Sequence, residues 1–77
     1  MDNNKDLFVF CENIKKIRKK ENLSKTEMSK LLGINTRTLS LIENGIIPPK
    51  LSSRIIFNIH HHFGILPQDL FSKIIRD

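Results

Sequence analysis

Three consecutive histidines and one cysteine are the side chains of this sequence best suited to bind a metal ion or attack a substrate. Consecutive helical residues point about 100° apart, whereas a chelating pair on one helix needs a spacing of four, so His60-His61-His62 is not arranged as a metal site. Cys11 lies among apolar residues with no neighbouring base to activate it, which predicts a core position. No glycine-rich phosphate loop and no paired carboxylates occur. We therefore expect no catalytic residue, no metal and no cofactor, and the protein is not expected to be an enzyme.

The charged side chains indicate a different chemistry, the recognition of a polyanion. Thirteen lysines and arginines stand against eight aspartates and glutamates, which gives the 77-residue chain a net charge of +5. Most of this excess lies in the first 40 residues, and a locally positive surface attracts partners such as nucleic acid. Basic runs are also common on solvated helix faces, so the five cations between residues 15 and 20 do not by themselves identify a binding surface.

Length and composition predict one small domain over residues 1–77. Its apolar fraction of 39% is dominated by isoleucine and leucine, without Trp or Tyr, so the core is expected to be aliphatic. A lone cysteine cannot form an internal disulfide, which is typical of a reducing cytosol. The apolar run 7–11 is too short for a signal sequence or a membrane span. We expect a cytoplasmic, nucleoid-associated protein with no membrane partner.

Apolar residues recur at helical spacing, and capping residues separate the runs. The first stripe spans roughly four helical turns and consists of Leu7, Phe10, Cys11, Ile14 and Ile17. Asn22 is expected to end this helix in a left-handed conformation. Ser24 and Glu27 then form the Ser-x-x-Glu pattern of a capping box, which predicts the start of a second helix. Gly33, which tolerates positive φ, is expected to end it.

Three further helices are expected after this glycine. Asn35 predicts the N-cap of a helix about two turns long, with Leu39 and Ile42 facing the core and Asn44-Gly45 at its end. The apolar faces of the last two helices are Ile55, Ile56, Ile59 and Phe63, and Leu70, Phe71, Ile74 and Ile75. No segment shows the period-two alternation of a half-buried strand, so the predicted class is all-α.

Two short helices joined by a glycine turn, over about residues 24–43, form the sequence pattern of a helix-turn-helix. The matching segments are Ile14-Lys15-Lys16-Ile17-Arg18, Leu23-Ser24, Met28-Ser29, Leu31-Leu32-Gly33-Ile34, Thr38-Leu39-Ser40 and Ile42-Glu43-Asn44-Gly45. With these segments the chain resembles the Cro and phage-repressor-like family, also called the xenobiotic-response-element family, over roughly residues 8–72. The resemblance implies a compact five-helix, lambda-repressor-like DNA-binding domain.

In such domains the second helix of the pair lies in the major groove, where each base pair displays a distinct set of donors and acceptors. The resemblance assigns the base contacts to the outward positions Thr36, Arg37, Ser40 and Leu41. Arg37 is the strongest candidate, because its planar guanidinium fits O6 and N7 of guanine together. The alternative is a solvated arginine on a polar helix face. Leu41 has no hydrogen-bonding group, so it either packs on a thymine methyl or covers the edge of the core.

Contacts with the DNA backbone are expected at helix termini and nearby cations. Ser24 and Lys25 begin the second helix, where free N–H groups and the positive end of the helix dipole favour an anion. The family often has glutamine where Lys25 stands, so a charged contact would replace an amide contact here. The expected set is Ser24, Lys25, Thr38, Asn44 and Lys50.

The resemblance also implies an ion pair between Arg18 and Glu43, which would join the first helix to the end of the third. The alternative is that both side chains are exposed and unpaired. If the pair is partly buried, removing one partner would strand a charge and destabilise the protein more than loss of a surface pair would.

Apolar residues in excess of what a core needs predict a homodimer. The loop after Gly45 is about two residues longer than the usual family spacing, and apolar surface on so short a chain usually contacts a partner. The candidates for this interface are Ile46, Ile47, Phe71, Ile74 and Ile75. A two-fold dimer would place two recognition helices about 34 Å apart and require a roughly palindromic operator. The alternative is a monomer whose loop isoleucines cover its own core.

The function expected from these observations is that of a sequence-specific regulator of transcription that binds double-stranded DNA. A repressor is expected rather than an activator, because the sequence shows no separate activating or ligand-binding segment. The alternative is a protein-interaction module with the same fold, such as an antitoxin that neutralises a toxin through its apolar surfaces.

Overall fold

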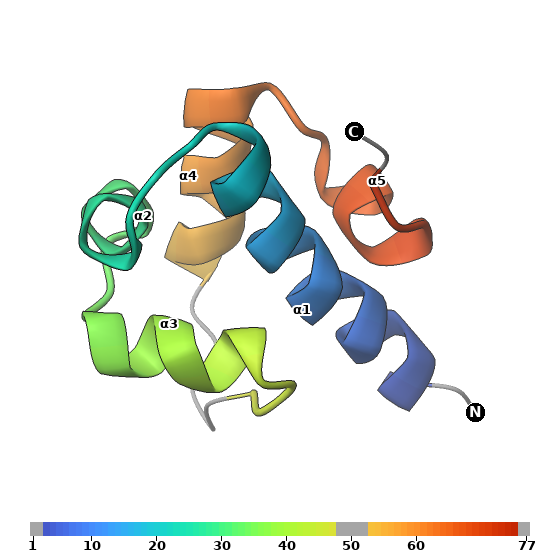
Figure 1. Ribbon diagram of the computed structural model, residues 1–77. Helices are drawn as coiled ribbons and strands as arrows, with labels where there is room; N and C mark the ends of the chain where they lie inside the picture. Colours follow the sequence, from blue (N-terminus) through green and yellow to red (C-terminus); the bar gives the residue numbers. More distant parts are fainter. Residues whose placement is uncertain (1–2, 48–52, 76–77) are drawn as a thin grey trace.

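Five helices joined by short turns make up the part of the chain that the computed structural model describes, residues 3–47 and 53–75. They are α1 (Asn3–Lys20), α2 (Lys25–Leu32), α3 (Thr36–Glu43), α4 (Ser53–Phe63) and α5 (Pro67–Ser72) (Figure 1). No strand occurs within these ranges, so the predicted all-α class is confirmed.

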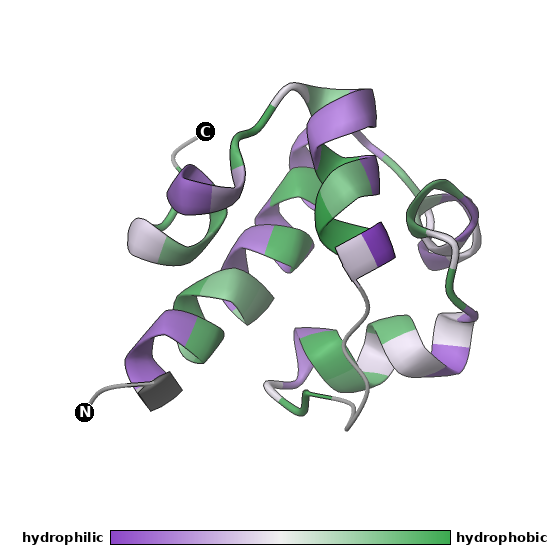
Figure 2. Ribbon diagram, turned by 180° about the vertical axis from the view of Figure 1, so that it is seen from behind, coloured by the Kyte–Doolittle hydropathy of each residue, from purple (hydrophilic) through white to green (hydrophobic). Residues whose placement is uncertain are grey.

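The longest helix, α1, lies between the other elements. It packs against α3 on one side and against α5 on the other, while α2 contacts both α3 and α4 (Figure 1). Along α1 and α4, apolar and polar residues alternate with the helical turn, as Figure 2 shows. The apolar faces meet in one core whose fully buried members include Phe10, Ile14, Met28, Leu32, Leu39, Ile42, Ile59 and Leu70.

Cys11 is part of this core, as predicted. Only 2% of the residue is exposed. Burial, and to a lesser extent the negative charge of Glu12, raises the pKa of the Cys11 thiol. The thiol therefore stays protonated at neutral pH and packs as a small apolar side chain.

The turn between α1 and α2 forms from the capping residues that the sequence predicts. Asn22 adopts a φ of 56°, and the N–H of Leu23 donates to the Arg18 carbonyl at 3.0 Å, which closes the end of α1. Ser24 Oγ accepts from the Glu27 N–H at 3.0 Å, and the Glu27 carboxylate accepts from the Ser24 N–H at 2.8 Å. This reciprocal capping box fixes the first residue of α2.

The turn between α2 and α3 sets the angle of the helix pair. Gly33 adopts a φ of 77°, and the N–H of Ile34 donates to the Ser29 carbonyl at 3.0 Å. Asn35 Oδ1 then accepts from the Thr38 N–H at 2.8 Å and begins α3. Both predicted caps are present, so the helix-turn-helix is specified locally by the sequence.

Two helix boundaries differ from the sequence prediction. Helix α1 begins at Asn3 and is about one turn longer than the four turns predicted from its apolar stripe. Helix α5 ends at Ser72, and Lys73 is extended with φ −155° and ψ 150°. Ile74 and Ile75 therefore lie beyond the helix, and the prediction that they belong to its apolar face is wrong.

A buried amide explains why α5 ends early. The side chain of Asn13, fully buried on α1, donates to the carbonyls of Leu70 at 2.7 Å and Lys73 at 3.0 Å. Its Oδ1 accepts from the Ile75 N–H at 2.7 Å. These bonds satisfy backbone groups that further helical turns would have used, and they hold the extended segment against α1.

Candidate nucleic-acid interface

The two sides of α3 differ sharply in exposure. Leu39 and Ile42 are fully buried, whereas Thr36 and Arg37 are exposed and Ser40 is half-buried. Leu41 remains 38% exposed. One side of the helix is therefore anchored in the core. The other side, which has the four residues expected to contact bases, faces solvent.

The start of α2 lies beside this outward side of α3. The ammonium group of Lys25 on α2 donates to the hydroxyl of Ser40 on α3 at 3.2 Å. This hydrogen bond is exposed and joins two residues that are 15 positions apart in the sequence. This bond brings a candidate for phosphate contact next to a candidate for base contact. The N–H groups of Lys25 and Thr26 take no part in the capping box, so they are available to an anion at the positive end of the helix dipole.

The C-terminal end of α3 is fixed to α1 by a bidentate ion pair. Arg18 Nε donates to Glu43 Oε2 at 2.7 Å, and Arg18 Nη2 donates to Glu43 Oε1 at 3.0 Å. Nη1 of the same arginine donates to the Leu23 carbonyl at 3.2 Å. The side chains are 16% and 6% exposed, so the pair is largely shielded from water. The hydrogen bonds to Glu43 raise the pKa of Arg18, so the guanidinium stays charged.

The geometry of the α2–α3 pair agrees with a comparison against protein families. A family model described as a helix-turn-helix domain matches residues 11–74, which is most of the chain. This chain belongs to the xenobiotic-response-element type of helix-turn-helix domain. Membership of this family indicates DNA binding, and the family is typically non-enzymatic. Comparisons with curated proteins and with solved structures found no match.

The remaining candidates for backbone contact lie at different places around the helix-turn-helix. Ser24 and Asn44 are exposed, at the start of α2 and directly after α3. The Thr38 N–H donates to Asn35 Oδ1, so the half-buried hydroxyl is the group of Thr38 that remains to contact the DNA backbone. Lys50 lies outside the described residues.

Two asparagines that hold the helix-turn-helix domain together were not found from the sequence. Asn58 on α4 donates to the Leu32 carbonyl at 3.1 Å and so satisfies the end of α2. Asn13 joins α1 to the segment after α5. A signal existed for Asn13, because it lies three residues after Phe10 and four before Ile17, inside the apolar stripe. The sequence offers no comparable signal for Asn58.

The five residues expected at a dimer interface are not equally exposed. Ile46, after α3, is 53% exposed, and Ile74, after α5, is 42% exposed. Ile47, Phe71 and Ile75 instead pack partly against the core. The Phe71 ring stacks on Phe10 with their centroids 5.0 Å apart. Ile46 and Ile74 are thus the most exposed of these five candidates.

The histidine triplet lies on the exposed side of α4. His61 stacks on Phe57, with centroids 6.2 Å apart. Within the described ranges no three His, Cys, Asp or Glu side chains are placed to hold a metal ion. None of the helices in those ranges has the length and apolarity needed to cross a membrane.

Proposed function

We propose that this helix-turn-helix domain is a sequence-specific regulator of transcription that inserts α3 into the major groove of double-stranded DNA. The main support is the two-sided character of α3. Leu39 and Ile42 anchor one side in the core, while Thr36, Arg37 and Leu41 are exposed on the other. A helix held in this way enters the groove as a rigid element and loses little conformational freedom on binding.

Each outward side chain has a distinct role in this proposal. Arg37 donates two hydrogen bonds to a guanine, which is worth about 1–3 kcal/mol of discrimination against other bases. Thr36 and Ser40 donate or accept single hydrogen bonds through their hydroxyls. Leu41, with 38% of its surface exposed, packs on a thymine methyl group.

Phosphate contacts set the register of α3 on the duplex. Lys25 and the free N–H groups at the start of α2 bind one phosphate, and the bond from Lys25 to Ser40 orients the ammonium group beside α3. Ser24, Thr38, Asn44 and Lys50 complete the proposed backbone contacts.

We further propose a homodimer on a roughly palindromic operator, with repression as the outcome. The exposed Ile46 and Ile74 lie after α3 and after α5, and α1 lies between those elements (Figure 1). One two-fold interface therefore uses one of these two surfaces. Repression needs no further contact, because an occupied operator excludes other proteins from the same DNA.

Selection of bound fragments from random DNA, followed by affinity measurements on variants, tests the base contacts. We expect Arg37→Ala to relax the preference at one base position of the selected site. Lys25→Ala is expected to weaken binding to all sequences similarly. Lys73→Ala, which makes the same change in charge on the far side of α1, serves as the control and is expected to change affinity little. Equal losses for Arg37→Ala on every sequence would contradict its proposed role.

A second candidate function is binding of a protein, such as a toxin, by a module with this fold. Phe57 and Phe8 favour it, because they are 65% and 57% exposed on α4 and α1. A salt titration distinguishes the two functions. Binding of DNA weakens steeply as salt rises, with a slope that follows the number of phosphates contacted. A module that binds only protein has almost no affinity for random DNA at any salt concentration.

A further inference from the structure

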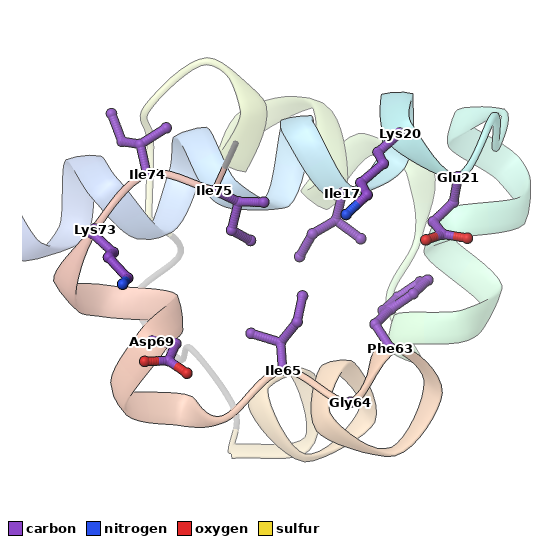
Figure 3. A pocket seen from close by; sticks show the side chains of 10 residues that line it. All are labelled: Ile17, Lys20, Glu21, Phe63, Gly64, Ile65, Asp69, Lys73, Ile74 and Ile75. Carbon is purple, nitrogen blue, oxygen red and sulfur yellow. The ribbon is translucent and has the colours of Figure 1, made fainter. Parts of the chain in front are cut away.

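A cavity lies between elements that the proposed DNA contacts do not use. The end of α1, the turn between α4 and α5, and the segment after α5 surround a volume of about 500 Å³ (Figure 3). No residue of α2 or α3 lines it. This volume is within the range of sites that bind small molecules, about 300–1,000 Å³.

The middle of the cavity is apolar. Figure 3 shows Ile17, Ile65 and Ile75 directed into it from three different segments, with Phe63 at one side. Ile17 is 2% exposed, and the other three are half-buried. These side chains favour a ligand with an aliphatic body.

Both ends of the cavity have one positive and one negative side chain. Lys20 and Glu21 lie at the end of α1, and Asp69 and Lys73 lie opposite them, on α5 and directly after it (Figure 3). Within the described part of the chain, the salt bridges are Lys15–Glu12 and Arg18–Glu43, so none of these four groups is neutralised by an ion pair there.

The wall formed by residues 73–75 is held in place by hydrogen bonds. Asn13 donates to the Lys73 carbonyl and accepts from the Ile75 N–H, from inside the core. A wall fixed in this way keeps the cavity formed before a ligand arrives, which lowers the entropy lost on binding.

We propose that this cavity binds a short zwitterionic peptide with aliphatic side chains. The peptide's ammonium group lies near Asp69, its carboxylate lies near Lys20 at the opposite end, and its side chains contact the isoleucines between them. A simple fatty acid fits less well, because its one carboxylate can pair with Lys20 while its other end offers no positive charge to Asp69.

Amide NMR spectra of the full chain, titrated with trileucine, test this site directly. We expect concentration-dependent shifts at Lys20, Ile65 and Lys73 with ~10 mM peptide, enough to detect a Kd of about 1 mM. N-acetyl-trileucine amide has the same side chains without the terminal charges, and it is expected to bind about 10-fold more weakly. No shifts with trileucine, or equal binding of the capped peptide or of decanoate, would overturn the proposal.

Charge variants identify the groups responsible. Lys20→Ala and Asp69→Ala each remove one exposed or half-exposed charge, and each is expected to weaken trileucine binding several-fold. Lys19→Ala, an exposed neighbour outside the cavity, is the control for net charge and is expected to bind normally. Arg37→Ala is also expected to bind normally, so a failure of the DNA proposal is distinguishable from a failure of this one. Normal binding by both Lys20→Ala and Asp69→Ala would contradict the site.

Discussion

At the scale of residues, the ion pair between Arg18 and Glu43 fixes the end of α3 against α1. It joins the end of α3 to α1 through two hydrogen bonds in a largely shielded place. Burying a charge is unfavourable unless a partner compensates it, so each member of the pair depends on the other. The consequences for stability differ between removing one partner and replacing both.

We expect Arg18→Ala to lower the free energy of unfolding by about 3 kcal/mol, because it leaves the Glu43 carboxylate buried without its partner. The double variant Arg18→Met with Glu43→Leu is expected to recover most of this loss, since no uncompensated charge remains. Urea unfolding followed by circular dichroism measures both changes.

The pair Lys15–Glu12 on α1, 3.7 Å apart and more exposed with 34% and 27% of its side chains accessible, is the matched control. Lys15→Ala is expected to change stability by less than about 0.5 kcal/mol. Similar losses for Lys15→Ala and Arg18→Ala would show that shielding from water is not the cause.

Ser29 is the second residue with a defined energetic consequence. Its hydroxyl on α2 is buried and has no hydrogen-bond partner in the part of the chain described. We expect Ser29→Ala to raise stability by about 1 kcal/mol, because an unsatisfied buried group is removed and alanine favours the helix. For a domain of this size the melting temperature would rise by roughly 4–8 °C.

Thr26→Ala, at an exposed position of the same helix, separates the two contributions to that gain. It provides the helix propensity of alanine without removing a buried hydroxyl, so its gain is expected to be smaller. An equal or larger gain for Thr26→Ala would contradict the explanation given for Ser29.

At the scale of elements, the α2–α3 turn is the feature that makes a helix pair into a helix-turn-helix. Gly33 combines a φ of 77° with close neighbours, because a Cβ built there lies 2.9 Å from Arg54 Cδ and 3.4 Å from Asn58 Nδ2. Asn58 also donates to the Leu32 carbonyl at the end of α2, so a methyl group at Gly33 would crowd the side chain that makes this hydrogen bond. Gly64 has a similar φ of 70° but nothing within 4 Å of its Cβ position.

We expect Gly33→Ala to destabilise the domain more than Gly64→Ala does. Gly64→Ala places an alanine in the left-handed region, which costs about 1–2 kcal/mol of strain. Gly33→Ala has the same strain and must also displace Arg54 and Asn58. Thermal unfolding of the two variants measures the difference in stability. Equal losses of stability would contradict this expectation, because they would mean that displacing Arg54 has no energetic cost.

The elements could be predicted from the sequence where local rules decide them. Asn22, Ser24 with Glu27, Gly33 and Asn35 each act within a few residues, so their sequence pattern is sufficient. The end of α5 is different, because a buried side chain 57 residues earlier, Asn13, bonds its last turn. Periodicity contains no information about such a distant contact, so it predicts a helix that includes Ile74 and Ile75, although α5 ends before them.

The candidate site was predictable to the same extent. Exposure of Thr36, Arg37 and Leu41 follows from the burial of Leu39 and Ile42, which helical spacing alone indicates. The contact between Lys25 and Ser40 depends on the angle between two helices, and the charged cavity depends on three segments meeting. Neither could be read from spacing along the chain.

For the whole molecule, the helix arrangement separates two surfaces. The outward side of α3 and the start of α2 form the proposed DNA contacts, and the cavity lies beyond α1, beside α5 (Figures 1 and 3). The net charge of +5 attracts DNA to the molecule as a whole, so affinity alone does not identify which surface binds it. The orientation of the bound domain has to be measured separately.

Amide and arginine side-chain NMR shifts on binding a selected DNA duplex measure this orientation. The account predicts that the largest changes occur at Thr36, Arg37 and Ser40, and at the N–H groups of Lys25 and Thr26, while Ile65 and Lys73 change little. Largest changes around the end of α1 and α5, with α3 unaffected, would contradict the proposal that α3 is the recognition helix.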